Sequence, residues 1–400
     1  MYTETIKLDS VITDIAAGPF GSNLKVSCFV EYGFPIIDGA NLKGFKVTDN
    51  IKKYVTEEKA RSLHRSIAHR NDVVVTISGT LGQIAYIPFD SKFEEYLCSQ
   101  RQFRVTFNTD RVHVPYLVYY FHSREGQHKI LSFANQTGVP ALSQPLKNFR
   151  NIEVNLPDIN TQKRIASVLK SLDNKIELNT KINENLEQQA QAILKSWFVD
   201  FEPFDGVMPD DWRIGTLSEI CGYSKDKVDI DSLTLDSYYS TENMQSNRQG
   251  AVQATTLPTI KQTTACKKGD VLISNIRPYF KKILYCFADC GCSTDVLCFV
   301  PNKNKYSAFL YCALFADKFF DYMVAGSKGT KMPRGDKQQI MAYPICIPSA
   351  EYIEKFNQAV APMLETVYTN RIEANNLANI RDTLLPKLMS GEIDVSEIQI

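Results

Sequence analysis

The sequence predicts an α+β fold with a pseudo-two-fold internal repeat, in which two mixed α/β globular domains are joined by two long antiparallel coiled-coil helices. Three observations support this prediction. The chain has 400 residues, too many for one ordinary core. Its first half is similar to its second half. Each half ends in a segment whose apolar residues recur with the period of a coiled coil.

The composition is that of a soluble globular protein, with 44% hydrophobic and 22% charged residues. No apolar run is long enough to cross a membrane, so we expect a cytoplasmic protein with no membrane partner. Formal net charge is zero, from 45 basic and 45 acidic side chains. A nucleic-acid partner would therefore have to meet locally segregated positive charge.

The globular part of each half contains the same strand pattern. The segment "NDVVVTISGTLGQIAY" from Asn71 is similar to "GDVLISNIRPYFKKILY" from Gly269, and both predict strand, loop and strand. Further on, "CSQRQFRV" from Cys98 is similar to "CSTDVLCFV" from Cys292, and residues 137–157 are similar to residues 329–348.

The cysteines do not indicate a zinc site. Four of the ten lie close together in the second half, but they lack the C-x2-C spacing of zinc ligands. We expect no metal here and instead reduced thiols packed in strands among apolar neighbours. This expectation covers Cys98, Cys292, Cys298 and Cys346.

After Pro157 and Pro348 the two halves align without a gap, at an offset of 191 residues. Apolar residues then follow in alternating steps of four and three, which predicts a helical seam. A helix of about 40 residues would be roughly 60 Å long. The residues expected to pair the helices are Ile165, Leu169, Leu172, Ile176 and Asn183 in the first, and Val360, Met363, Val367, Asn370 and Leu377 in the second.

Asparagines interrupt the seam at residues 179, 183 and 370. If the helices are antiparallel and centred near Lys181 and Ile372, Asn183 lies level with Asn370, and this polar pair would fix the register. The alternative is a solvated asparagine beside a frayed seam. Between the halves, "WFVDFEPFDGVMPDDW" predicts a helix stop and a new domain. The expected segments are 1–157, 158–204, 205–348 and 349–400.

Three motifs resemble the DNA specificity subunits of type I restriction-modification enzymes. "LPDINTQKRIASVLKSLDNKIELN" from Leu156 is similar to the family's entry into its first long helix. "KSWFVDFEPF" from Lys195, followed by "MPDDW" from Met208, resembles the helix exit and the start of the second domain. "RDTLLPKLMSGEI" from Arg381 resembles the C-terminal signature. One departure is that "IPSAEYIEKFNQ", at the second helix entry, lacks the Gln-Lys-Arg triplet of residues 162–164.

The resemblance implies two target-recognition domains, each reading one half of a bipartite site in double-stranded DNA, and helices that set the spacer. It also implies two modification subunits as partners, together with restriction subunits. The chain itself would be non-catalytic and without cofactors, while S-adenosylmethionine, ATP and Mg would belong to the partners. The sequence agrees, since it contains no amino-methylation motif of the Asn-Pro-Pro-Tyr type and no Walker lysine motif.

A nuclease remains the catalytic alternative, because Asp49, Glu57, Glu58 and Lys59 resemble the elements of a two-metal endonuclease. We favour instead a short helix that begins after an N-cap at Thr56, with the acidic residues in its first turn.

For DNA contact in the first half, the basic run of Arg61, Arg65 and Arg70 suits phosphates, with a solvated helix face as the alternative. The loop "GPFGS" from Gly18 either cradles a phosphate or makes a turn. Further candidates in this half are Ser78, Thr80, Gln100 and Arg101.

In the second half, we expect Arg277 to pair with a guanine edge, and Lys281 and Lys282 to meet phosphates. The alternative is an ordinary polar hairpin. The full set of candidates in this half is Asn275, Arg277, Tyr279, Lys281, Lys282, Lys331 and Arg334.

Two other functions remain open from the sequence. One is a structural adaptor whose coiled coil joins two protein-binding domains. The other is a DNA-reading subunit of an orphan methyltransferase or of another phage-defence system.

Overall fold

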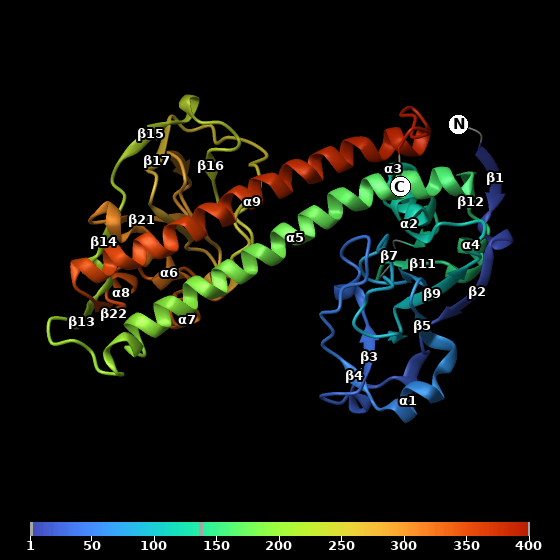
Figure 1. Cartoon of the computed structure of the whole chain (residues 1–400), viewed down its shortest axis with the longest axis horizontal. Coiled ribbons are helices and arrows are strands. Elements are labelled where there is room, and N and C mark those ends of the chain that lie inside the picture. The colour runs from blue at the N-terminus through green and yellow to red at the C-terminus, as the bar shows by residue number, and fades with distance from the viewer. Residues whose placement is uncertain (1–2, 136–138, 399–400) are drawn as a thin grey trace. The chain divides into compact units, whose positions relative to one another are not determined.

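The computed structural model describes residues 3–135 and 139–398 and divides the chain into two compact units (Figure 1). Unit 1 comprises residues 1–174 and 378–400, and unit 2 comprises residues 175–377. The repeated motif that starts at Thr137 has its first two residues outside the described part of the chain.

Two long helices dominate the chain, and both are shared between the units. They are α5 (Ile159–Phe198) and α9 (Ala350–Ser390). The first part of α5 belongs to unit 1 and the rest to unit 2, whereas α9 begins in unit 2 and ends in unit 1. The two predicted long helices are therefore present.

Unit 1 contains two four-stranded sheets. The first is antiparallel, in the order β2-β9-β6-β7, and the second has the order β4-β3-β8-β5 with a parallel β3–β8 pair. The strands are β1 (Thr3–Lys7), β2 (Ile12–Ala17), β3 (Phe34–Ile37), β4 (Tyr54–Val55), β5 (Ile67–His69), β6 (Val73–Thr76), β7 (Ile84–Tyr86), β8 (Glu95–Cys98), β9 (Gln102–Phe107), β10 (Ala134–Asn135), β11 (Ala141–Leu142) and β12 (Glu153–Pro157). The helices of this half are α1 (Glu57–Ser62), α2 (Val114–His122), α3 (Arg124–Leu131) and α4 (Pro145–Arg150).

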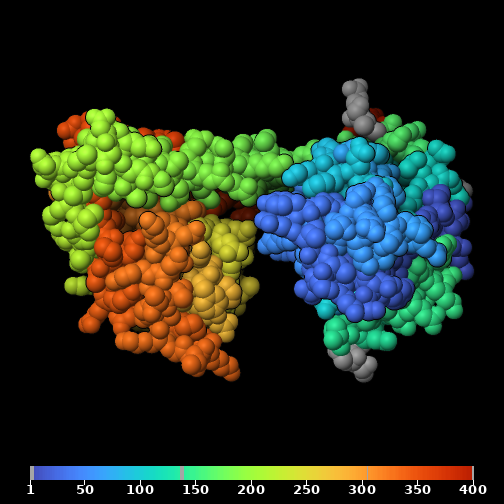
Figure 2. All heavy atoms as spheres, turned by 90° about the horizontal axis from the view of Figure 1, so that it is seen from below, coloured from blue at the N-terminus to red at the C-terminus, as the bar shows by residue number. Residues whose placement is uncertain are grey.

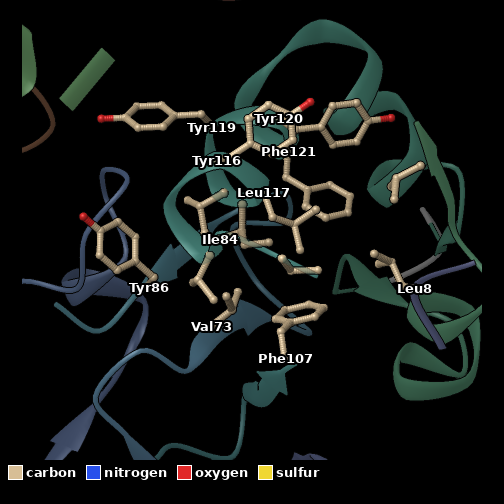
Figure 3. Packing of buried hydrophobic residues seen from close by; sticks show 14 of the residues in the cluster. Leu8, Val73, Ile84, Tyr86, Phe107, Tyr116, Leu117, Tyr119, Tyr120 and Phe121 are labelled. Carbon is tan, nitrogen blue, oxygen red and sulfur yellow. The ribbon is translucent and has the colours of Figure 1, made fainter. Parts of the chain in front are cut away.

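The core of unit 1 lies between the first sheet and α2. Figure 3 shows Leu117 and Phe121 of α2 facing Val73, Ile84 and Phe107 of the sheet. Burial of such large apolar side chains is the main source of stability. The same cluster includes Ile165 and Leu169 of α5 with Leu385 and Leu388 of α9 and Val395 beyond it.

Unit 2 repeats this arrangement. Its antiparallel sheet has the order β14-β21-β18-β19, and its second sheet has the order β15-β17-β20-β16 with a parallel β16–β20 pair. The strands are β13 (Arg213–Thr216), β14 (Cys221–Tyr223), β15 (Lys227–Asp229), β16 (Tyr238–Tyr239), β17 (Gln262–Cys266), β18 (Val271–Ser274), β19 (Ile283–Tyr285), β20 (Cys290–Cys292), β21 (Val296–Pro301) and β22 (Pro344–Ile347). The shorter helices are α6 (Ser307–Phe315), α7 (Asp317–Ala325) and α8 (Lys337–Met341).

The predicted strand-loop-strand segments are β6–β7 and β18–β19, which occupy the same places in their two sheets. The internal repeat and the α+β class are thus confirmed. All ten cysteines are free thiols, and the four expected in strands lie in β8, β20, β21 and β22. Among the described residues, no group of His, Cys, Asp or Glu is arranged to hold a metal ion.

The helices pair in antiparallel fashion. In unit 2, Asn179 contacts Glu373, Asn183 contacts Val367 and Phe198 contacts Phe356, so position rises along one helix as it falls along the other. The ten seam residues predicted from the sequence are all buried or half-buried. The seam is not reserved for pairing, however, because Ile165 and Leu169 also pack into the globular core. No helix in the described ranges is long and apolar enough to span a membrane.

Candidate nucleic-acid interface

Three loops of unit 2 are joined side by side by backbone hydrogen bonds. The amide of Asn275 donates to the carbonyl of Asp295 over 2.8 Å, and the amide of Arg277 donates to the carbonyl of Pro333 over 2.8 Å. Ile276 forms an antiparallel bridge with Arg334. We call residues 275–277, Asp295 and residues 333–335 the second platform. Because these bonds fix its backbone from two sides, its side chains project from a rigid base.

The loop that follows this platform has an unusual backbone. Arg277 and Lys281 both have φ of 51°, in the left-handed region. The neighbouring residues Asn247 (φ 55°) and Arg248 (φ 64°) are also left-handed. The amide of Asn247 donates to the carbonyl of Phe280, so the two loops hold each other. Such non-glycine conformations cost about 1 to 3 kcal/mol each and cluster at functional sites.

Ionic contacts connect this loop to the long helices. Asp317 accepts hydrogen bonds from Arg248 and Lys281, each at 2.5 Å, and these bonds lower the pKa of Asp317 to about 2. Arg371 of α9 donates to the backbone carbonyl of Arg248 (2.9 Å) and to Glu187 of α5 (2.7 Å). The loop that carries Arg277 is therefore braced against the helix pair within unit 2.

A pocket of about 570 Å³ lies beside the second platform. Arg277, Lys282, Ser293, Asp295 and Met332 are among its lining residues. Two buried polar atoms there, Nε of Arg277 and Oγ of Ser293, have no hydrogen-bond partner within the described residues. Unpaired buried polar atoms are costly, so their presence in a pocket favours a polar ligand.

Unit 1 contains the same framework. The amide of Ile77 donates to the carbonyl of Arg101 over 2.6 Å, and the amide of Gly79 donates to that of Pro140 over 3.0 Å. Leu142 donates back to the carbonyl of Ile77 over 2.8 Å. We call residues 77–79, Arg101 and residues 140–142 the first platform. By these bonds and bridges, Gly79 corresponds to Arg277, Arg101 to Asp295, and Ala141 to Arg334.

The "GPFGS" loop packs against Ser99 and Gln100, which directly precede Arg101 of the first platform. A Cβ on Gly18 would lie 1.9 Å from the carbonyl oxygen of Ser99, so only glycine fits there. The side chain of Gln100 donates to the carbonyls of Gly21 and Leu24. Gln100 thus holds this loop in place. The blue N-terminal part of the chain, to which the loop belongs, forms most of the surface of unit 1 seen in Figure 2.

The basic run of the first half is divided among several elements. Thr56 caps α1 as expected, by accepting a hydrogen bond from the amide of Lys59. Arg61 is paired with Glu57 and Glu95. The other two arginines differ from each other, since Arg70 donates to the carbonyl of Ser91 and pairs with Glu94, whereas the side chain of Arg65 is exposed. Ser78 and Thr80 flank Gly79 of the first platform.

The lysines of the second half are used differently from one another. Lys281 is paired with Asp317, and Lys282 donates to the carbonyl of Thr241 while burial lowers its pKa. Both amines therefore already have protein partners. Lys331 and Tyr279 are exposed, and Arg334 pairs with Asp295 at 3.0 Å. Asn275 is buried, and its Oδ1 lacks a partner among the described residues.

The candidate nuclease carboxylates are engaged in structural contacts. Asp49 accepts hydrogen bonds from the hydroxyl of Tyr96 (2.5 Å) and the amide of Lys92 (3.0 Å). Glu57 pairs with Arg61 on the next turn of α1. These contacts support a structural role for both acidic residues.

Sequence reasoning overlooked Ser293 and Asp295. A signal was present, because "CSQR" from Cys98 and "CSTD" from Cys292 align Ser99 with Ser293 and Arg101 with Asp295. The bracing residues Arg248 and Arg371 had no such signal, since their contacts join segments that lie far apart in the chain.

Comparison with known proteins gives a consistent result. A family model described as "Type I restriction modification DNA specificity domain" matches residues 21–188 and 209–382. The MjaIX type I restriction enzyme specificity subunit of Methanocaldococcus jannaschii is 26% identical over 381 residues, covering 87% of this chain and 83% of that protein. The HindI type I restriction enzyme specificity subunit of Haemophilus influenzae is 23% identical over 389 residues, covering 78% and 84%.

The fold has a solved counterpart as well. The crystal structure of a type I restriction-modification system S subunit from M. genitalium has a TM-score of 0.63 at 17% sequence identity. The likeness covers 97% of this chain and 96% of that one.

Proposed function

Because this chain belongs to the type I restriction modification DNA specificity domain family, we propose that it gives a type I restriction-modification complex its DNA sequence specificity. Each globular domain reads one half of a bipartite target in double-stranded DNA. The paired helices set the separation of the two halves and dock the modification subunits.

The observation that carries this proposal is the presence of two platforms with one backbone framework and different side chains. Where the first platform has Gly79 and Arg101, the second has Arg277 and Asp295. A repeated scaffold with exchanged polar groups suits the reading of two different half-sites, because base edges are distinguished by donor and acceptor patterns.

The partners follow from the same proposal. Two modification subunits carry out methyl transfer with S-adenosylmethionine, and restriction subunits cleave DNA with ATP and Mg, so this chain is a non-catalytic, cytoplasmic subunit. Leu178 and Ile182 of α5 and Ile372 of α9 are exposed apolar residues on the helices. These side chains are available for contacts with the modification subunits that the proposal requires.

Genome-wide mapping of N6-methyladenine tests the proposal. Deletion of the gene should abolish methylation at one split motif and leave other motifs unchanged, and re-expression should restore it. An unchanged methylome would overturn the proposal and favour a coiled-coil adaptor. If the motif disappears, cleavage of unmodified DNA by the purified complex separates a full restriction system from an orphan methyltransferase.

A further inference from the structure

We propose that the corresponding platform residues Gly79 with Arg101 and Arg277 with Asp295 determine the specificity of the two domains. In the second domain, Arg277 and Asp295 read one G·C pair, through guanine and the cytosine amino group respectively. In the first domain, Arg101 reads a guanine above Gly79. This inference rests on the proposed function. It adds which residues of each domain contact which bases.

The side chain of Arg277 is prepared for a ligand. Its Nε is buried without a partner in the described part of the chain. A terminal guanidinium nitrogen makes a long hydrogen bond, 3.5 Å, to the carbonyl of Lys331. The backbone below it is fixed by the bond to Pro333 and by the left-handed conformation. A guanidinium held in this way presents a fork that matches O6 and N7 of guanine.

Asp295 lines the same pocket and supplies hydrogen-bond acceptors, whereas Arg277 supplies donors. One of its carboxylate oxygens accepts a hydrogen bond from Arg334 at 3.0 Å, and its side chain remains 40% exposed. A carboxylate is repelled by phosphates, so near DNA it is useful only where it meets a donor. The amino group of cytosine is such a donor in the major groove.

The first platform also presents an arginine, but at the position of Asp295 instead of the position of Arg277. Arg101 is exposed, and its side chain makes no ion pair within the described residues. A Cβ on Gly79 would lie 3.7 Å from Nη1 of Arg101. The guanidinium of Arg101 therefore lies beside the position from which Arg277 projects in the other domain. Ala141 stands at the position of Arg334, so the first platform has no cation at that position.

The test uses the intact complex with its modification subunits and a DNA library that is randomised at every position of both half-sites. Arg277→Ala and Asp295→Asn should each relax discrimination at one G·C pair of one half-site, by about 10- to 100-fold. Arg101→Ala should do the same at a guanine of the other half-site only. Arg277→Lys keeps the charge without the fork, so it should retain overall binding and still lose discrimination.

Arg213→Ala and Arg150→Ala are matched controls, because each removes a surface arginine that is paired elsewhere in its domain, with Glu219 and Asp9 respectively. They should leave both half-sites unchanged. The inference fails if the platform variants weaken all sequences equally, if Arg101 and Arg277 affect the same half-site, or if the affected pair is not G·C. If the unmodified complex itself recognises no split motif, the proposed function fails instead. Thermal unfolding of each variant excludes misfolding as the cause of a loss.

Discussion

Asn370 of α9 donates a side-chain hydrogen bond of 2.9 Å to Oδ1 of Asn183 on α5. Asn183 is buried and in turn donates to the carbonyl of Val367 over 3.2 Å. The two asparagines are thus hydrogen-bonded to each other across the seam, one turn from the buried Asn179. Such a polar pair favours one register, because a shift of the helices would leave both amides unpaired.

Replacement of both asparagines by leucine should raise the melting temperature, since an apolar pair of similar size needs no hydrogen bond. Asn370→Leu alone should lower the free energy of unfolding by about 1 to 3 kcal/mol, because it leaves the buried Oδ1 of Asn183 without its donor. Disulfide trapping between cysteines introduced along the helices should show several registers in the double variant. A double variant with lower stability and one register would contradict this role.

Arg371 and Glu187 form an ion pair whose side chains are only 24% and 15% exposed. Burial raises the pKa of Glu187, while the charge of Arg371 lowers it. Arg371→Ala should therefore lower the free energy of unfolding by about 2 to 3 kcal/mol, because the carboxylate loses its partner. Denaturant unfolding should show that Glu187→Gln recovers part of this loss in the double variant. Purely additive losses would mean that the pair is not coupled.

The pH dependence of stability should include a contribution from His113. Burial, with smaller effects from Lys163 and Lys170, lowers the pKa of His113 to about 4. The unfolded chain binds a proton at about pH 6.5. Between these two pH values His113 is protonated in the unfolded state but not in the folded state. The free energy of unfolding therefore falls as the pH falls from about 6.5 to about 4.

His113→Gln should flatten this part of the pH profile. The backbone amide of His113, which donates to Gln162 over 2.8 Å, is retained in the variant. Melting temperatures measured between pH 7 and pH 5 test this expectation, with His64→Gln as an exposed control. An equal pH dependence in the wild type and His113→Gln would count against it.

Lys331 and Lys281 should differ in DNA binding. Lys331 is exposed, and its amine has no ion-pair partner in the described ranges, whereas Lys281 is paired with Asp317. Lys331→Ala should weaken binding to specific and random DNA alike and reduce the slope of log K against log salt by about 0.9. Lys281→Ala should change the slope less. Titrations at several salt concentrations measure both slopes, and a larger change for Lys281 would reverse the assignment.

The long helices and the internal repeat were predictable from the sequence, because heptad spacing and a constant offset are local signals. The use of Gln162 was not, although it belongs to a recognisable motif. Its buried amide donates to the carbonyls of Arg111 and Pro157. That role depends on tertiary contacts between the start of α5 and residues of the first domain. The spacing of residues along the sequence does not predict such contacts.

The individual DNA-contacting residues were harder to predict for a related reason. Lys281, Lys282 and Arg61 look like phosphate ligands in the sequence, yet each has a protein partner. Exposed and paired cations are indistinguishable without tertiary contacts. The platforms themselves arise from hydrogen bonds between three loops that lie apart in the chain, so only the folded arrangement identifies them.

The core of unit 1 is closed by Leu385, Leu388 and Val395, which are synthesised long after residues 1–174 of the same unit. At about 5 to 20 residues per second, the ribosome needs roughly 10 to 40 s to proceed from residue 174 to these positions. During that interval nascent unit 1 has an uncovered apolar surface. Chaperone binding and misfolding at this surface then compete with correct folding. A premature stop codon before Leu385 would therefore leave the core of unit 1 incomplete.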